Sequence, residues 1–565
     1  MYCDSKMKSS SDNNFLSTLT FASLPIDRRL AEAVREKFGY EYMSQPQSLS
    51  IPAALTGRDV FVKAKTGSGK TLAFLIPAIH NTFSVSPSSA SGRRKRTGVR
   101  ILVLSPSREL AMQTCSEASK LLSSWTPSNS IGVQLVMGGT DIKKERGRLQ
   151  RERVDILVAT PGRLIDHLEN TGVDGFSGAM TDLSVLVLDE ADRLLDSGFA
   201  PALDRISKFL PPKEERQTLL FTATVPPAVL KTAGALMRKD YEKVMAAGTT
   251  RSSGSRSSSG ATPNVTQSVR VFRTSPDLYK SLYALLSAAR RTKSGVTGTK
   301  TGGTGNVTPG RPVAPLGTSQ RQVVFPKIIV FFPTARMAQM MAEAFRQAGM
   351  PDALELHSRL SQSQRTLVTK TMSAASTSAR GVIVFASDVI ARGVDFPDVT
   401  LVVQVGLTDP EQYVHRVGRT GRGGKAGEAI SLLLEDESGG LLRSLSSNPS
   451  ITVTQPCTLS KAKSTVTKSI STQSSRTVGD NALFRALRAP TFKWENAFSA
   501  TLGFYNSNRR QLGWDKPSLV RGVKERFAFF SAKEGSLQSF RPRMSMQTLK
   551  KMQISDMAEE FDVRV

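Results

Sequence analysis

The sequence predicts an α/β protein made of two tandem parallel-sheet domains and a small basic helical extension at the C-terminus. Three observations support this fold class. Two long blocks of the chain alternate short apolar runs, rich in β-branched residues, with amphipathic stretches. Such alternation is typical of strand–helix–strand units in a parallel sheet that is buried on both faces. A polar segment separates the blocks, and beyond about residue 435 the alternation ends and basic residues predominate.

The first block, residues 21–246, follows a Ser-rich N-terminus of residues 1–20 that we expect to be disordered. Amphipathic patterns predict helices at Thr71–Ile79 and Glu109–Leu122. Apolar runs around them predict six strands, at Asp59–Ala64, Arg100–Ser105, Gly132–Met137, Asp155–Ala159, Ser184–Asp189 and Gln217–Thr222.

The second block is predicted at residues 266–441, after a Ser-, Gly- and Arg-rich flexible linker of residues 247–265. Inside it, residues 292–320 are rich in Gly, Thr and Pro and contain no acidic residue. Such a composition cannot bury enough apolar surface to fold, so we expect an exposed low-complexity insertion. The strand candidates are Gln267–Phe272, Lys327–Phe332, Gly381–Phe385, Thr400–Val405 and Ala426–Leu433.

The remaining chain is divided into a Ser/Thr-rich connector, residues 442–480, and a basic helical extension with its tail, residues 481–565. From residue 442 onward the sequence contains 20 Lys and Arg against 9 Asp and Glu. We expect the aromatic residues of the extension to form a small core. Four cations are expected on a basic face that would bind a polyanion, namely Lys524, Arg526, Arg541 and Arg543.

Composition and charge limit the functional classes to which the protein can belong. The formal charge of +28 favours a polyanionic partner, because each neutralised phosphate releases a counterion. A basic tail or a ribosome-associated surface without catalysis would carry the same charge. The scattered cysteines exclude a CxxC metal site and a disulfide framework and predict a reducing compartment. No apolar run reaches the roughly 18 residues that cross a bilayer, so we expect a soluble protein with no membrane partner.

A phosphate-binding loop is predicted where the first strand meets a helix. Its glycines let backbone N–H groups surround phosphate oxygens, and the helix N-terminus adds a positive dipole. Lys70 can reach the β- and γ-phosphates, and the Thr71 hydroxyl can bind Mg²⁺. A chance Gly-rich turn is the alternative, and transporters, kinases and motors share the motif. The loop comprises Ala64, Lys65, Thr66, Gly67, Ser68, Gly69, Lys70 and Thr71.

An acidic run, Asp189-Glu190-Ala191-Asp192, follows the apolar strand that ends at Leu188. The carboxyl end of a parallel strand faces the crevice in which open α/β sheets bind ligands. Asp189 suits Mg²⁺, and Glu190 is placed to orient or deprotonate a water molecule. Alone, the run would indicate a solvated helix start; after a phosphate loop it indicates a nucleotide hydrolase.

With these motifs, the chain resembles the DEAD-box RNA helicases of superfamily 2 from Phe21 to Leu434, in which about ten short motifs occur in the family's order. The resemblance implies two RecA-like domains, ATP and Mg²⁺ as cofactors, and RNA as partner. It implies an enzyme that hydrolyses ATP on binding RNA, locally unwinds short duplexes and remodels RNA or RNA–protein particles. The resemblance also assigns Phe21 and Gln47 to ATP, because the family's glutamine reads the adenine edge. Here Met43-Ser44-Gln45-Pro46 departs from the family's pattern before that glutamine, and a surface glutamine is the alternative.

Further motifs resemble the family's grips on the RNA backbone, where arginines, hydroxyls and free N–H groups bind phosphates without reading sequence. Ser387 replaces the family's usual threonine and keeps its hydroxyl. The residues that this resemblance assigns to RNA are Pro106, Arg108, Gly138, Gly139, Thr160, Arg163, Arg365 and Ser387.

The second block supplies the rest of the ATP site by resemblance. Asp395 matches the family's ribose-binding aspartate. Arg416 and Arg419, three apart, are expected on one helix face, from which they would reach the γ-phosphate as arginine fingers. A structural salt-bridge cluster is the alternative. Hydrolysis would be coupled to strand separation through Thr222, Thr224, Asp192 and His415, with Thr222 replacing the family's serine.

The C-terminal part resembles the helical extension of fungal mitochondrial splicing-type DEAD-box proteins, which are general RNA chaperones. Its pattern includes Leu502-Gly503-Phe504-Tyr505 and Leu512-Gly513-Trp514. This resemblance favours an intracellular protein of the mitochondrion over one of the nucleus or nucleolus, although the N-terminus is a poor presequence. We expect a monomer with possible protein partners in RNA–protein particles. The alternatives are a non-enzymatic ATP-dependent RNA clamp, a DNA helicase and a processive translocase.

Overall fold

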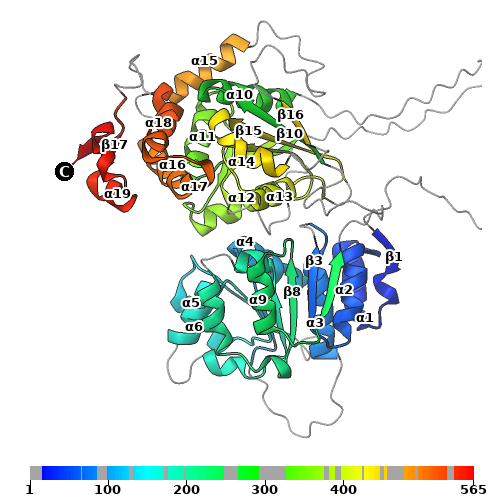
Figure 1. Cartoon of the computed structure of the whole chain (residues 1–565). Helices are drawn as coiled ribbons and strands as arrows, with labels where there is room; N and C mark the ends of the chain where they lie inside the picture. The colour runs from blue at the N-terminus through cyan, green and yellow to red at the C-terminus, as the bar shows by residue number, and fades with distance from the viewer. Residues whose placement is uncertain are drawn as a thin grey trace, which may run out of the picture.

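The computed structural model confirms an α/β fold with two parallel sheets (Figure 1). None of the helices in the described part of the chain is long and apolar enough to cross a membrane. The structure describes residues 16–64, 67–84, 98–125, 131–170, 176–195, 199–246, 265–291, 326–374, 381–388, 396–422, 425–445, 451–454, 476–489, 494–530 and 540–564.

The first domain contains seven parallel strands in the order β5-β6-β4-β7-β8-β3-β9. All six predicted strands are confirmed, and the sequence missed only β9. The strands are β3 (Val60–Ala64), β4 (Ile101–Leu104), β5 (Val133–Val136), β6 (Ile156–Ala159), β7 (Val185–Leu188), β8 (Gln217–Thr222) and β9 (Glu242–Ala246). The helices are α1 (Arg28–Ala33), α2 (Gln45–Leu55), α3 (Lys70–Ile79), α4 (Arg108–Leu121), α5 (Ile142–Arg151), α6 (Pro161–Asn170), α7 (Ala191–Leu194), α8 (Ala200–Ser207) and α9 (Pro227–Leu236).

Burial on both faces explains why the central strands β4, β6 and β7 are apolar at every position. In β4, Ile101 and Val103 belong to the core on one side of the sheet, and Leu102 and Leu104 to the core on the other. Helices cover both faces, so an alternating polar pattern would leave unpaired polar groups in a core.

The second domain repeats this architecture with the strand order β12-β13-β11-β14-β15-β10-β16, again all parallel. The five predicted strands are confirmed, and the short edge strands β12 and β16 were not predicted. The strands are β10 (Val265–Phe272), β11 (Lys327–Phe331), β12 (Leu354–Leu356), β13 (Val382–Ala386), β14 (Val399–Val405), β15 (Gly427–Leu434) and β16 (Ile451–Thr454). The helices are α10 (Ser275–Arg291), α11 (Ala335–Gln347), α12 (Gln362–Ala374), α13 (Pro410–Val417) and α14 (Glu435–Leu445).

The C-terminal helices, orange to red in Figure 1, lie against the second domain. Phe498, Leu502 and Phe527 share one hydrophobic core with the residues of α11, so the aromatic core predicted for the extension is confirmed and is continuous with the domain. The elements are α15 (Arg476–Leu487), α16 (Glu495–Ser507), α17 (Arg509–Leu512), α18 (Lys516–Phe527), β17 (Arg543–Ser545), α19 (Met546–Lys551) and β18 (Asp562–Arg564).

Two cations of the expected basic face are buried, so that prediction was wrong for them. Lys524 is 3% exposed and donates to Glu560 at 2.7 Å. Arg526 is 6% exposed and donates to both carboxylate oxygens of Asp436, at 2.7 and 2.9 Å. Each cation has a carboxylate partner that offsets the cost of its desolvation.

Three predicted boundaries also differ from the structure. Residues expected to be disordered include β1 (Leu16–Thr20), which pairs antiparallel with β2 (Tyr42–Ser44). The last residue of the expected linker, Val265, begins β10 and pairs with Gly427. The expected connector contains the end of α14, the whole of β16 and the start of α15. Polar composition hid these elements because edge strands and helix ends need few apolar side chains. The insertion at 292–320 and the other linker residues lie outside the described residues.

Candidate active site

The residues predicted to bind the nucleotide and those predicted to bind RNA lie on different halves of the first sheet. The phosphate loop, the acidic run and Thr222 follow or end β3, β7 and β8, which are adjacent. The predicted RNA grips follow β4, β5 and β6, which are adjacent on the other half. Because carboxyl ends of parallel strands share one edge, a nucleotide and a polymer could bind side by side along it.

A cavity of about 370 Å³ lies at the nucleotide half of this edge. Both domains line it. The first domain contributes the described part of the phosphate loop, Asp189 and Glu190, and the second domain contributes Arg419 and Arg422. Lys65 and Thr66 of the loop lie outside the described residues, as does Asp395.

The phosphate loop needs its glycines at two positions. Gly67 and Gly69 adopt left-handed φ values of 73° and 82°, which only glycine adopts without strain. A side chain at Gly69 would also collide with the Gln47 amide, and one at Gly67 would press on Arg422 of the other domain. Lys70 begins α3, is buried and donates to the Ala64 carbonyl at 3.3 Å, so its ammonium lies within the loop.

The acidic run supplies two buried carboxylates beside this loop. Burial and the neighbouring Glu190 carboxylate raise the pKa of Asp189 to about 7. Glu190 sits in the left-handed region at φ 50°, which stores backbone strain at the site. Its Oε2 atom is buried, and no described residue forms a hydrogen bond with it. Asp189 and the Thr71 hydroxyl supply oxygen donors of the kind that fits Mg²⁺.

Of the two residues predicted at the base-binding end, Gln47 lines the cavity and Phe21 does not. Gln47 is buried and its amide binds the protein: Oε1 accepts from the Ser44 N–H at 2.8 Å, and Nε2 donates to the Gly69 carbonyl at 2.9 Å. Phe21 is 2% exposed and belongs to the core of the first domain, so it does not line the cavity. The apolar and aromatic side chains that line this end of the cavity are Leu16, Phe38, Tyr40 and Tyr42. Tyr40 stands in the motif that led to Gln47, so this signal was available in the sequence.

The arginines of the second domain also differ from expectation. Arg416 is 1% exposed, donates from Nε and Nη2 to Asp388 at 2.9 and 2.6 Å, and does not line the cavity. The prediction that Arg416 and Arg419 share one helix face fails because α13 ends at Val417, before Arg419. Arg422, which was not predicted, lines the cavity beside Arg419. A third arginine in the same run was the signal that was overlooked.

The four residues predicted to couple the sites lie together between the domains. Asp192 accepts from the Thr224 hydroxyl at 2.8 Å and from its N–H at 3.1 Å. The Thr222 hydroxyl donates to the Thr224 carbonyl at 2.6 Å. From the second domain, His415 Nε2 lies 3.5 Å from Asp192 Oδ2, and both side chains are buried. A change at the acidic run can therefore reach both domains through this cluster.

The predicted RNA grips lie at the other half of the edge. A side chain at Gly139, where φ is 87°, would collide with the Arg108 guanidinium, and one at Gly138 would stand 3.1 Å from it. Pro106, Thr160 and Ser387 follow β4, β6 and β13 and are buried or nearly so. Gly138 and Gly139 are needed because the backbone there lies close to the Arg108 guanidinium.

Two predicted RNA residues bind protein groups in this structure. Arg163 donates to Glu145 at 2.8 Å and to the Thr140 carbonyl at 3.0 Å. Arg365 of α12 forms an ion pair with Glu109 of α4 at 2.5 Å, and this pair joins the two domains. Both guanidinium groups are therefore held at the edge where the grips meet.

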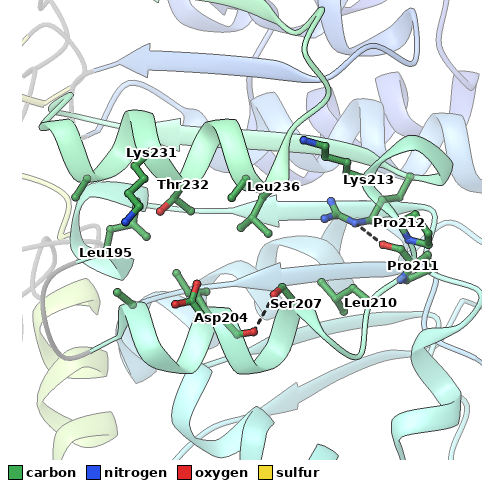
Figure 2. Close-up of a pocket in the computed structure, with 15 residues that line it drawn as sticks. Leu195, Asp204, Ser207, Leu210, Pro211, Pro212, Lys213, Lys231, Thr232 and Leu236 are labelled. Atoms are coloured by element: carbon green, nitrogen blue, oxygen red, sulfur yellow. Dashed lines mark hydrogen bonds between the residues drawn. The ribbon is translucent and has the colours of Figure 1, made fainter.

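A larger groove of about 640 Å³ lies elsewhere in the first domain. Figure 2 shows it between two helices, with Asp204 and Ser207 on α8 and with Lys231, Thr232 and Leu236 on α9. None of the predicted nucleotide or RNA residues lines it. The smaller cavity between the domains, and not this groove, contains the groups for phosphate chemistry.

Comparisons with known proteins agree with this geometry. The DEAD/DEAH box helicase family model matches residues 44–232, and the helicase conserved C-terminal domain model matches residues 321–424. The chain is 38% identical to DEAD-box ATP-dependent RNA helicase 26 of Oryza sativa subsp. japonica, over 90% of this chain and 81% of the relative. It is 35% identical to the mitochondrial ATP-dependent RNA helicase mss116 of Aspergillus oryzae, over 73% of this chain and 57% of the relative.

Among solved structures, the fold is similar to that of Mss116p bound to single-stranded RNA and AMP-PNP. The TM-score is 0.73 at 22% identity, and the match covers 99% of each chain. The match includes the C-terminal helices as well as both sheets. The RecA-like architecture with a helical extension is thereby confirmed.

Proposed function

The chain belongs to the DEAD-box family of ATP-dependent RNA helicases, and from this premise we propose that it hydrolyses ATP in the cavity between its two sheets. One observation carries the proposal. The cavity combines a phosphate loop and two buried carboxylates from one domain with two arginines from the other. Neither domain alone contains the whole set, so turnover requires both.

Each group has a role that its chemistry supports. Backbone N–H groups of the loop and Lys70 bind the β- and γ-phosphates. Glu190 orients and deprotonates the attacking water, because its carboxylate has an oxygen free of bonds to described residues. Arg419 and Arg422 neutralise charge that develops on the γ-phosphate. Thr71 and Asp189 would hold Mg²⁺, which supplies further charge neutralisation when bound.

We assign adenine to the end of the cavity lined by Tyr40, Tyr42 and Leu16, where an aromatic or apolar side chain can cover the base. Gln47 also connects the base-binding end to the phosphate loop, because its side-chain amide donates a hydrogen bond to the Gly69 carbonyl.

RNA binding is proposed along the grips that follow β4, β5, β6 and β13. The grips offer backbone N–H groups, hydroxyls and cations, which suit a phosphate backbone and read little sequence. Since the ATP cavity and the grips both span the two domains, a closed arrangement favoured by one ligand must also favour the other. This coupling supports local unwinding: closure on one strand excludes its partner, and hydrolysis releases the clamp.

The similarity to mitochondrial relatives supports two further proposals. We propose a general RNA-chaperone role, because the Mss116p structure shares the helical extension. We also propose a mitochondrial location, supported by the name of the Aspergillus relative. Protein partners in RNA–protein particles remain part of the proposal.

Steady-state ATP hydrolysis by the purified chain tests the function. It would be measured without nucleic acid, with RNA and with DNA, for the wild type and for Glu190→Gln. We expect RNA to stimulate turnover and the variant to abolish it. Stimulation by DNA alone would favour a DNA helicase. Absence of turnover with ATP-dependent retention of RNA would favour a clamp.

A further inference from the structure

One buried carboxylate outside the family's motifs joins the predicted RNA grips of the first domain. Glu145 lies in the first turn of α5 and is 5% exposed. Its Oε1 atom accepts a hydrogen bond from the Thr140 hydroxyl and one from the Met137 N–H at 3.4 Å. These two residues flank Gly138 and Gly139 directly. The carboxylate therefore holds both ends of the glycine pair.

The second oxygen of the same carboxylate binds the following helix. Glu145 Oε2 accepts from Arg163 Nη1 at 2.8 Å and lies 3.1 Å from His167 Nε2. Both residues are on α6, which begins at Pro161, directly after Thr160. Arg163 completes a ring of contacts, because its Nη2 donates to the Thr140 carbonyl at 3.0 Å. Three segments that are separate in sequence thus meet at one carboxylate.

The charge of this carboxylate is compensated by its surroundings. Burial acts to raise the pKa of Glu145, but the bonds from His167, Thr140 and Arg163 outweigh it and lower the pKa. The carboxylate is therefore ionised at neutral pH. An ionised acceptor makes stronger hydrogen bonds than a neutral one, which suits a group that holds a loop in place.

The glycine pair needs such an external support. Glycine has more backbone freedom to lose than any other residue, and two glycines follow one another here. Gly139 is in the left-handed region and lies against the Arg108 guanidinium. Because both residues are glycines, the loop has no side chains of its own to fix it. A grip that binds phosphates with backbone N–H groups works only when those groups point in one direction.

We propose that Glu145 is a positioning residue for RNA binding, which fixes the Gly138–Gly139 loop and Arg163 in the orientation that RNA requires. The inference rests on the proposed function and adds a residue to it. Glu145 itself does not touch RNA. It acts through the loop on one side and through Arg163 on the other.

The test compares Glu145→Ala and Glu145→Gln with a matched control, Glu152→Gln. Glu152 directly follows α5, and its carboxylate accepts a hydrogen bond from the Gln134 side chain at 3.0 Å, so the control also neutralises a hydrogen-bonded carboxylate. The readouts are affinity for a single-stranded RNA in the presence of AMP-PNP, ATP turnover as a function of RNA concentration, and thermal stability. We expect Glu145→Ala to weaken RNA affinity and raise the RNA concentration for half-maximal turnover, each roughly 10-fold.

Several features separate positioning from a merely structural role. Turnover at saturating RNA and the KM for ATP should change less than 2-fold, roughly, since the ATP half of the edge is untouched. Glu145→Gln retains an acceptor for Thr140 and Met137 but loses the charge that pairs with Arg163, so its affinity should lie between those of the wild type and Glu145→Ala. The control should bind RNA like the wild type.

Salt dependence gives an independent readout. Because Glu145 acts through Arg163 and through uncharged backbone N–H groups, its variants should lower the slope of log affinity against log salt by no more than about 1, which is the contribution of Arg163. Arg108→Ala, which removes a proposed phosphate contact, should lower that slope by about 1. A larger change of slope in the Glu145 variants would contradict the proposal, because more phosphate contacts would then be lost than Arg163 can supply.

The outcomes distinguish this inference from the proposed function. If wild-type turnover does not respond to RNA, the proposed function fails. If it responds, and the Glu145 variants bind RNA as tightly as the wild type, the positioning role is wrong. If both Glu145 variants lose thermal stability, Thr140→Val decides, because it keeps the Glu145 carboxylate and removes the Thr140 hydroxyl, which contacts Glu145, the Met137 carbonyl and Arg163. Wild-type RNA affinity in a folded Thr140→Val protein would then overturn the inference.

Discussion

Three arginines of one short stretch have different surroundings, although the sequence makes them look equivalent. Arg416 donates twice to Asp388 and its guanidinium lies 5.3 Å from the centre of the Phe331 ring. Arg419 and Arg422 instead line the cavity between the domains. The end of α13 at Val417 separates them, because residues past a helix end no longer follow its periodicity.

Substitution of these arginines should give opposite results in two assays. Arg422→Ala should lower RNA-stimulated turnover at least about 100-fold with little change in melting temperature, because it removes charge stabilisation of the γ-phosphate. Arg416→Ala should lower the melting temperature, since it leaves Asp388 unpaired next to a buried site. Turnover and thermal melting of both variants check this. Equal loss of turnover with unchanged melting would show that Arg416 also reaches the phosphate.

Among the secondary-structure elements, strand β1 contributes to the nucleotide cavity, which its composition did not indicate. Its first residue, Leu16, pairs with Ser44 in β2 and lines the nucleotide cavity beside Tyr40, which is 53% exposed. Leu16, Leu19 and Tyr42 are also exposed, which is unusual for large apolar side chains unless a ligand covers them. The strand is therefore a wall of the cavity.

Removal of this strand should weaken ATP binding. We expect deletion of residues 1–20 to raise the KM for ATP roughly 3- to 10-fold, since part of the apolar cover of the base is lost. Deletion of residues 1–15, which leaves β1 intact, is the matched control and should have the wild-type KM. Steady-state kinetics at saturating RNA measures both. An unchanged KM after the longer deletion would mean that β1 does not contact the nucleotide.

The extension is held to the second domain by a buried ionic and aromatic cluster. Arg526 on α18 binds Asp436 at the start of α14, and its guanidinium lies 4.8 Å from the centre of the Tyr505 ring and 5.3 Å from that of Trp514. Tyr505 also donates to Glu437. These contacts explain why Arg526 is buried, although the sequence predicted it on a basic surface.

Loss of Arg526 should destabilise the second domain together with the extension. We expect Arg526→Ala to cost about 3–5 kcal/mol, because the buried Glu437 carboxylate would lose its cation and Asp436 would lose the two hydrogen bonds from Arg526. Arg521→Ala, on the exposed side of the same helix, is the matched control and should cost less than about 0.5 kcal/mol. Denaturant unfolding followed by tryptophan fluorescence measures both variants. Similar values for the two would show that the cluster contributes no stability.

For the whole molecule, the relevant feature is the set of contacts between the two domains. Arg365 and Glu109 form a buried ion pair, and His415 approaches Asp192. These contacts join α12 to α4 and α13 to α7, on the two halves of the same sheet edge. The ATP cavity and the RNA grips are therefore completed by one arrangement of the domains.

Breaking the Arg365–Glu109 pair should shift this arrangement. With fluorophores on the two domains, ATP and RNA together should raise energy transfer in the wild type. Arg365→Ala should need at least about 10-fold more RNA for half of that rise, because Glu109 would be left buried and unpaired on closure. Lys370→Ala, at an exposed position of α12, should behave like the wild type. A wild-type response of Arg365→Ala would exclude the pair as a determinant of closure.

The sequence alone determined the two sheets, and it predicts most of the residue types that line the proposed ATP site. Strands buried on both faces leave long apolar runs, and phosphate chemistry requires Gly, Lys, Thr and paired carboxylates at fixed spacing, so both signals are local. The edge strands β9, β12 and β16 and the separate strand β1 escaped notice because a short, half-exposed strand needs no apolar run.

Only the tertiary structure decided which of several similar side chains reach the site. Phe21 and Tyr40 are both aromatic, Arg416 and Arg422 are both arginine, and Arg526 was expected on the same surface as Arg543. Their positions depend on where a helix ends, on which carboxylate lies opposite and on how two domains meet. Glu145 is the clearest case, since its partners come from the loop before α5 and from α6, which the sequence does not show to lie together. Contacts between distant segments are set by packing, and the order of residues along the chain does not specify them.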